Sequence, residues 1–272
     1  MSAPNNKPVT LKKSSITDNH LKKTSWYISI AGLISFSTVI PLNIHISIKD
    51  MAGYTWMWPL IGGLLGVLVG LVGLILQNIL LPPLIIATIV YSFALYFTGF
   101  HHLDGLIDMG DALMAHGTPA RKIEIMRDPR IGTGGISIFF IVAAITVATI
   151  ASLPPVNLFY ALFISEIGAK LGLVSCCTLS SPEDHGTGKY FIKAMNPYLM
   201  SIIVIISLLI GFLLLKSVGV AGIIGSVLAG IYVALMARKH FKTATGDVLG
   251  AANEISRMVS FLSMLIAFMW IG

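Results

Sequence analysis

Long apolar runs recur along the whole chain and are separated by short polar segments. An α-helix needs about 20 predominantly apolar residues to cross the hydrocarbon core of a bilayer. Pro82, Pro154 and Pro197 stand at breaks between these runs, where a proline ends or begins a helix. The pattern therefore predicts an all-α, polytopic integral membrane protein with about seven transmembrane helices. They are expected near residues 58–80, 84–100, 135–153, 158–179, 198–216, 219–237 and 258–271.

The first apolar run, residues 26–40, is short for a span because Pro41 interrupts it. An N-terminal interfacial or re-entrant helix is expected there. Three polar segments are separated from one another by two predicted spans each, so they emerge on one membrane face. They are residues 101–134, 180–197 and 238–257. If residues 26–40 do not cross, the lysine-rich residues 1–25 share that face, which the positive-inside tendency assigns to the cytoplasm.

Two parts of the chain are therefore expected. Residues 1–25 form a basic cytoplasmic tail, and residues 26–272 form a single domain embedded in the plasma membrane, multi-pass, with its polar loops on the cytoplasmic face. No cleavable signal peptide is expected, because the first apolar run lacks a small-residue cleavage site.

Composition agrees with the lipid bilayer as the protein's environment. The mean hydropathy is +0.87, with 56% hydrophobic and 11% charged residues. The net charge of +6 suggests nucleic acid at first sight, but the basic residues lie at the ends of apolar runs, as in cytoplasmic loops, so no nucleic-acid partner is expected. Cys176 and Cys177 are adjacent in an apolar run and offer neither a disulfide framework nor a metal-ligand spacing.

The charged residues concentrate in residues 100–135, which hold five of the twelve acids. Asp104, Asp108 and Asp111 follow the i, i+4, i+7 spacing of one helical face, and His101 extends that face. Carboxylates so close together repel one another and call for a cation. Hard oxygen ligands beside phosphate suit Mg²⁺, so the three aspartates are predicted magnesium ligands. The alternative is a solvated polar face.

Basic and turn-forming residues beyond the aspartates are candidates for phosphate contacts. Arg127 and Arg130 offer guanidinium forks of N–H donors. The glycine-rich residues 132–135 and Lys189, which lies in a GTGK run, are compatible with an anion contact and equally with plain connectors. Asp247 stands beside a tight turn, where it is either a helix N-cap or a ligand of metal or substrate.

Four successive motifs resemble those of the cobalamin synthase family, the adenosylcobinamide-GDP ribazoletransferases. They are HxLDGLxDxxDAL, EIMRDPRIGTGG, GTGKYF and TGDVLGAANE. The sequence departs from the family pattern at Ala112, where glycine is usual, and at Glu183 and Asp184, which make their loop more acidic. The resemblance implies transfer of phosphocobinamide from adenosylcobinamide-GDP to the 3′-hydroxyl of α-ribazole or its 5′-phosphate, with release of GMP.

The resemblance also implies roles for the residues in these motifs. Asp104, Asp108 and Asp111 would hold Mg²⁺ at the diphosphate, with Arg127, Arg130 and Lys189 near its oxygens. His101 or Asp128 would accept the proton of the attacking hydroxyl.

Two other functions compete with this interpretation. A CDP-alcohol phosphotransferase also sets aspartates four apart on membrane helices, but its usual signature places Ala-Arg after the Asp-Gly, where this chain has Leu106 and Ile107. An ion-coupled transporter would use intramembrane carboxylates, yet the acids here cluster at span ends on one face. The sequence leaves the oligomeric state open, a homo-oligomer included.

Overall fold

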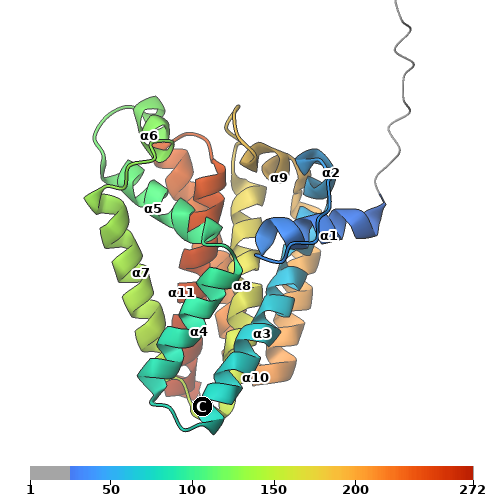
Figure 1. The fold of residues 1–272 in the computed structure, drawn as a ribbon, viewed down its shortest axis with the longest axis vertical. Coiled ribbons are helices and arrows are strands. Elements are labelled where there is room, and N and C mark those ends of the chain that lie inside the picture. Colours follow the sequence, from blue (N-terminus) through green and yellow to red (C-terminus); the bar gives the residue numbers. More distant parts are fainter. Residues whose placement is uncertain (1–24, 272) are drawn as a thin grey trace, which may run out of the picture.

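The computed structural model describes residues 25–271, and this part of the chain folds into helices without a strand (Figure 1). The all-α prediction is confirmed. The helices are α1 (Trp26–Ser37), α2 (Ile48–Ala52), α3 (Trp58–Asn78), α4 (Pro83–Phe97), α5 (His101–Met114), α6 (Pro119–Met126), α7 (Thr133–Ser152), α8 (Leu158–Leu179), α9 (Gly188–Ala194), α10 (Pro197–His240) and α11 (Gly246–Ile271), with 3-10 turns η1 (Thr55–Met57) and η2 (Pro155–Asn157). Apart from Ser25, the expected basic tail lies outside the described residues.

Five helices in the described chain are long and apolar enough to cross a membrane: α3, α7, α8, α10 and α11. The number rises to six if α4 and α5, which are bent by 94° at the break between them, count as one span. The prediction of a multi-pass membrane protein is confirmed. The number seven stays a prediction, and it depends on how α10 is counted.

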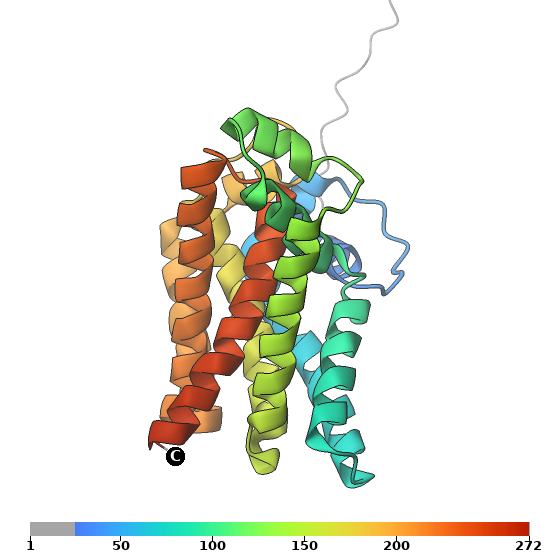
Figure 2. The same ribbon diagram turned by 90° about the vertical axis from the view of Figure 1, so that its left-hand side faces the viewer.

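Helix α10 contains a chain reversal within its 44 residues. Leu215 and Lys216 have non-helical backbone angles, and a Cβ placed on Gly219 would collide with the backbone of Gly211. Eight residues of continuous helix would hold these two glycines about 12 Å apart. The contact therefore requires two arms that run antiparallel, which lie side by side in Figure 2. The reversal falls between the predicted spans 198–216 and 219–237.

Helix α4 ends at Phe97, short of the expected end at residue 100, because the chain turns sharply there. Gly99 and Phe100 both adopt the left-handed conformation, with φ of 61° and 59°. The turn sends α5, which carries the aspartate motif, across the end of the bundle (Figure 1). We place α5 outside the membrane-spanning segments.

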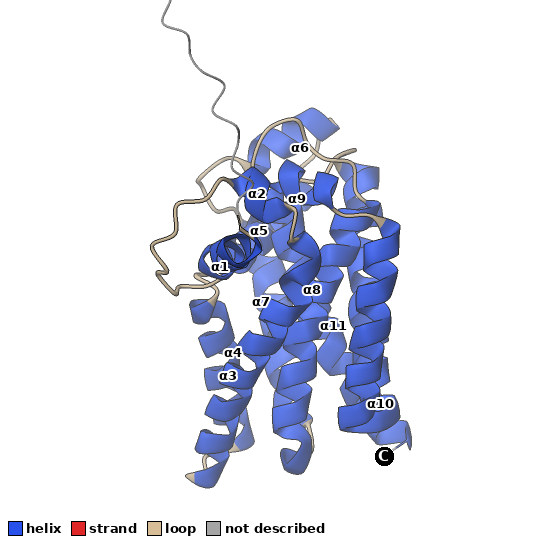
Figure 3. Cartoon of the chain, turned by 90° about the vertical axis from the view of Figure 1, so that its right-hand side faces the viewer, coloured by secondary structure: helices blue, strands red, loops and turns tan. Residues whose placement is uncertain are grey.

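Helix α1 has 12 residues, which corresponds to about 18 Å of helix. The hydrocarbon core is about 30 Å thick, so α1 is too short to cross it. The helix lies across the long axis of the bundle beside α3 (Figures 1 and 3). This arrangement agrees with the expected interfacial or re-entrant helix.

Helix α8 is the centre of the bundle, since α3, α10 and α11 all pack against it and most of its side chains are buried. Small residues permit these close contacts. A Cβ on Gly66 of α3 would lie 2.8 Å from the Cα of Phe163, and one on Gly62 would collide with the carbonyl oxygen of Glu166. The spaced glycines of α3 therefore pack a helix interface, as expected from the sequence.

The polar segments gather at one end of the bundle, where α6, α9 and the start of α11 meet (Figure 1). Two of them are joined by backbone hydrogen bonds: Glu183 N–H donates to the carbonyl of Ala244 (3.1 Å) and Ala244 N–H to that of Ser181 (2.8 Å). This contact joins two of the three polar segments, and Figure 1 shows the third, which carries α5 and α6, at the same end, as predicted.

Candidate active site

Two helices cross where the first and last motifs meet. Gly105 of α5 packs on the first turn of α11, and a Cβ there would lie 2.6 Å from the carbonyl oxygen of Asp247. Gly250 of α11 approaches α5 in the same way, with its Cβ position 3.2 Å from the Cα of His102. Because neither glycine leaves room for a side chain, the backbones touch. This crossing brings Asp104 and Asp247 to the same cavity.

Asp247 is not the N-cap of α11. Thr245 has that role, because its Oγ1 accepts the backbone N–H of Val248 at 3.4 Å. The Thr245 hydroxyl also donates to Oδ2 of Asp247 at 3.1 Å and orients that carboxylate. Of the two interpretations of Asp247, the structure excludes the cap and leaves the carboxylate facing the cavity.

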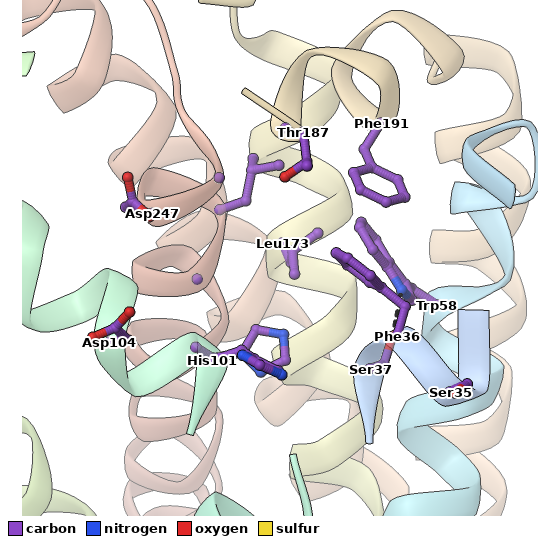
Figure 4. Close-up of a pocket in the computed structure, with 15 residues that line it drawn as sticks. Ser35, Phe36, Ser37, Trp58, His101, Asp104, Leu173, Thr187, Phe191 and Asp247 are labelled. Carbon is purple, nitrogen blue, oxygen red and sulfur yellow. Dashed lines mark hydrogen bonds between the residues drawn. The ribbon is translucent and has the colours of Figure 1, made fainter. Parts of the chain in front are cut away.

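The cavity has a volume of about 510 Å³ and lies at the polar end of the bundle. In Figure 4 the carboxylates of Asp104 and Asp247 stand on one side, and the aromatic rings of Phe36, Trp58 and Phe191 on the other. His101 and His102 also line it. One space thus adjoins an acidic wall and an aromatic wall, the first contributed by α5 and α11 and the second by α1, α3 and α9.

Asp108 does not line the cavity, but its carboxyl is close enough to the acidic wall to interact with it. Burial raises the pKa of the Asp108 carboxyl to about 7, and the charges of Asp104, Asp247 and Asp111 add to the shift. Neighbouring carboxylates disfavour a further negative charge on Asp108. With a pKa of about 7 this carboxyl is about half protonated at neutral pH, and a bound cation would favour its ionised form.

The structure does not assemble a complete protein ligand set for a metal. Within residues 25–271, no group of three or more His, Cys, Asp or Glu side chains is placed to hold an ion. This donor set still fits Mg²⁺, which binds through one or two carboxylates and leaves its other positions to water and substrate phosphate.

Asp111 differs from Asp104 and Asp108, which share its helical face, in its hydrogen-bond partners. Its Oδ2 accepts the N–H of Gly132 at 2.7 Å, and its Oδ1 accepts that of Gly135 at 2.8 Å. The carboxylate therefore caps the start of α7 and fastens it to α5. The backbone N–H groups of Gly132 and Gly135 were candidates for a phosphate contact, and these hydrogen bonds already occupy them.

The predicted phosphate ligands also have partners within the protein. Arg127 pairs with Glu183 at 3.4 Å, and the Nζ of Lys189 donates to the carbonyl oxygen of Asp184 at 2.9 Å. Arg130 pairs with Asp128 at 2.7 Å. None of Arg127, Arg130 and Lys189 lines the cavity.

Two candidates for the proton acceptor differ in position and charge. His101 lines the cavity, whereas Asp128 does not. Hydrogen bonds from the Arg130 side chain and backbone lower the pKa of the Asp128 carboxyl to about 2. A carboxylate with so low a pKa accepts a proton poorly at neutral pH. The geometry therefore favours His101.

A buried ionic cluster beneath the site was not predicted from the sequence. Arg257 donates to both carboxylate oxygens of Glu166, at 2.7 and 3.0 Å, and also pairs with Glu254. All three side chains are at most 2% exposed. Lys170 lies nearby on α8, and its Nζ is 3.0 Å from Nε2 of His102. The signal that could have revealed it is the presence of ionisable residues inside apolar helices.

The fold and the site together define a class: a polytopic helical membrane protein with a carboxylate-lined cavity at its polar end. Residues 29–265 match the family model described as cobalamin-5-phosphate synthase. The chain therefore belongs to the cobalamin-5-phosphate synthase family.

Several similar proteins share one name. The adenosylcobinamide-GDP ribazoletransferase of Thermococcus kodakarensis is 32% identical over 88% of this chain and 98% of its own length. The protein of that name from Methanosarcina barkeri is 29% identical over 89% of this chain and 93% of its own, and that of Clostridium novyi 31% over 86% and 94%. No solved structure matches the chain.

Proposed function

We propose that this chain is an adenosylcobinamide-GDP ribazoletransferase. In this reaction the 3′-hydroxyl oxygen of α-ribazole, or of its 5′-phosphate, bonds to the phosphorus attached to cobinamide. The bond from that phosphorus to the bridging oxygen breaks, GMP leaves, and the hydroxyl proton is released. The observation that carries the proposal is the meeting of two family motifs, through Asp104 and Asp247, at one cavity of a membrane-embedded bundle.

Mg²⁺ is proposed to bind one or two of three neighbouring carboxylates, those of Asp104, Asp108 and Asp247, with water and substrate phosphate at its other positions. Asp104 and Asp108 belong to the predicted set of magnesium ligands. Asp247 takes the place expected for Asp111, whose oxygens accept hydrogen bonds from the start of α7. Bound there, Mg²⁺ would offset the negative charge of the substrate diphosphate. The raised pKa of Asp108 supports this choice, because a cation relieves the repulsion that causes it.

His101 is proposed to accept the proton of the attacking hydroxyl, because it lines the cavity. Arg127 is the most suitable of the basic candidates for a phosphate oxygen, since its charge acts on Asp247 and its bond to Glu183 is long. Arg130 and Lys189 would have to exchange their present partners for substrate.

The polar end of the bundle is proposed to face the cytoplasm across the plasma membrane. Lysines and arginines flank the predicted spans at this end, in agreement with the positive-inside tendency. Water-soluble substrates would then enter the cavity directly from the cytoplasm.

The test is a reaction in membranes that contain the protein, supplied with adenosylcobinamide-GDP, α-ribazole 5′-phosphate and Mg²⁺. Wild type should form a corrinoid product and GMP in equal amounts. Asp184→Asn, a change at an exposed loop acid, is the matched control and should react as wild type does. Absence of product from wild-type membranes with folded protein would refute the proposal, and solute uptake without GMP release would indicate a transporter.

A further inference from the structure

Three aromatic side chains from separate helices form one wall of the cavity. We call Phe36 of α1, Trp58 of α3 and Phe191 of α9 the aromatic wall. The ring centroids of Trp58 and Phe191 are 4.7 Å apart, and those of Phe36 and Phe191 are 5.3 Å apart. Contacts at these separations hold the rings in fixed relative positions.

Phe36 is the member of the wall that is open to a ligand. Its side chain is 39% exposed, whereas Trp58 is 4% and Phe191 2% exposed. Trp58 donates its indole N–H to Oγ of Ser37 at 3.0 Å, which ties α3 to the residue next to Phe36. The wall thus presents an apolar ring on a rigid support, and its one indole donor already has an acceptor.

Such a surface suits a flat aromatic base of low polarity. Stacking on an aromatic side chain stabilises a bound base without needing hydrogen bonds. Both substrates of the proposed reaction carry a base: the benzimidazole of α-ribazole and the guanine of adenosylcobinamide-GDP. Guanine has several donors and acceptors that need partners when buried, and the aromatic wall offers none. The benzimidazole has a single free ring nitrogen and suits the wall better.

The position of the wall agrees with the chemistry of the acceptor. The diphosphate belongs at the acidic wall, with Asp104 and Asp247, and the attacking hydroxyl must reach it from within the cavity. A nucleoside with its base on the aromatic wall would direct its ribose toward the carboxylates (Figure 4). A volume of about 510 Å³ accommodates one small ligand.

We propose that the aromatic wall is the binding site for the benzimidazole base of the α-ribazole acceptor, with Phe36 as the stacking ring. This inference rests on the proposed function and adds to it a specificity-determining residue. It also gives α1 a role: this short helix supplies Phe36 and Ser37 and completes the acceptor site.

The test compares Phe36→Ala, Phe36→Tyr and the control Phe140→Ala. Phe140 is 69% exposed on α7 and lies outside the cavity. Calorimetric binding of α-ribazole to purified protein is measured without donor, and the KM of each substrate is measured in the full reaction. Phe36→Ala should raise the Kd and KM for α-ribazole about tenfold and leave the KM for adenosylcobinamide-GDP unchanged. Phe36→Tyr, which keeps the ring, and Phe140→Ala should bind as wild type does.

The outcomes separate this inference from the proposed function. If wild type turns over and Phe36→Ala binds α-ribazole within twofold of wild type, the assignment of the wall is wrong. If Phe36→Ala raises only the KM of adenosylcobinamide-GDP, the aromatic wall binds guanine, and the assignment to α-ribazole is again wrong. If wild type shows no turnover, the proposed function fails, and the binding measurement still decides whether Phe36 holds the base.

Discussion

The glycine that follows Asp104 matters at the residue scale as much as the carboxylate does. Gly105 allows α5 to rest on the backbone of Asp247, with no room for a methyl group at 2.6 Å. A Gly105→Ala substitution should separate the two helices and displace Asp104 from Asp247. Since a misplacement of about 1 Å can cost 10²-fold in rate, we expect kcat to fall by about that factor.

The control for this substitution is Gly53→Ala. The nearest atom to a Cβ at Gly53 is a carbonyl oxygen at 3.7 Å, an ordinary contact. GMP release by this variant should match that of wild type. Equal activity of Gly105→Ala and wild type would show that the crossing of α5 and α11 does not position the carboxylates.

Binding of Mg²⁺ should depend on pH through the proton on Asp108. The pKa of this carboxyl is raised to about 7, so the group is protonated below that pH and ionised above it. The metal competes with the proton, and its affinity should therefore rise by about tenfold between pH 6 and pH 8. Calorimetric titration of the purified protein with Mg²⁺ at the two pH values measures this change.

Asp108→Asn is the comparison, because it removes the titrating group. We expect weaker binding of Mg²⁺ to this variant and little change between pH 6 and pH 8. An affinity of wild type that does not vary over this range would contradict the role given to Asp108.

Helical spacing predicted which aspartates share a face, but not which partner each carboxylate takes. Asp104 lines the cavity, and Asp108, one turn along the same helical face, is close enough to interact with its charge. Asp111 lies one turn further along, where the start of α7 supplies two amide donors. Asp247 lies far away in sequence, and only the crossing of α5 and α11 brings it close. The spacing of residues within one helix gives no information on contacts between helices that are distant in sequence.

At the scale of elements, the buried ionic cluster joins the two helices that support the site. Arg257 and Glu254 belong to α11 and Glu166 to the central α8. An Arg257→Met substitution should leave the carboxylates of Glu166 and Glu254 buried without their arginine partner. Removing one partner of a buried pair costs about 3–5 kcal/mol, so the thermal unfolding temperature in detergent should fall by several degrees.

Neutralising the whole cluster should restore most of that loss. The triple variant Glu166→Gln, Glu254→Gln and Arg257→Met removes the three paired charges together, and we expect it to be more stable than Arg257→Met alone. Arg238→Met, a change at an exposed arginine, serves as the control. Equal stability of Arg257→Met and wild type would show that the cluster does not hold α8 and α11 together.

The sharp turn between α4 and α5 was not predicted from the sequence. An apolar run up to residue 100 predicts a straight span, and the run does continue that far. Phe100 nevertheless takes a left-handed conformation that is rare for a bulky residue. The packing of α5 against α7 and α11 stabilises this turn, and these partners are distant in sequence.

For the whole molecule, the chain reversal within α10 decides how often the chain crosses the membrane. Labelling of single cysteines tests it, because Cys176 and Cys177 are buried and should not react. Asp184→Cys should react from the face that carries α6 and α9. Leu80→Cys, at a position that is 88% exposed, and Lys216→Cys should react from the opposite face. Labelling of residues 184 and 216 from the same side would contradict the reversal.

Sequence pattern anticipated the whole-molecule architecture better than the cavity. The apolar runs and their prolines placed the long helices, and loop spacing placed the polar segments at one end. The aromatic wall was not foreseen, because Phe36, Trp58 and Phe191 resemble ordinary apolar residues of three separate helices. Only their packing around one cavity distinguishes them.

The central claim is that carboxylates of α5 and α11 act as one site for the transfer of phosphocobinamide. The most direct measurement is the kcat for GMP release by Asp104→Asn, Asp247→Asn and the double variant, at equal amounts of folded protein. Each single change should lower kcat by about 10²-fold or more, and the double variant should lose little beyond that, because residues that act as a unit are not additive. Wild-type kcat in either single variant, or losses that multiply in the double variant, would contradict the claim.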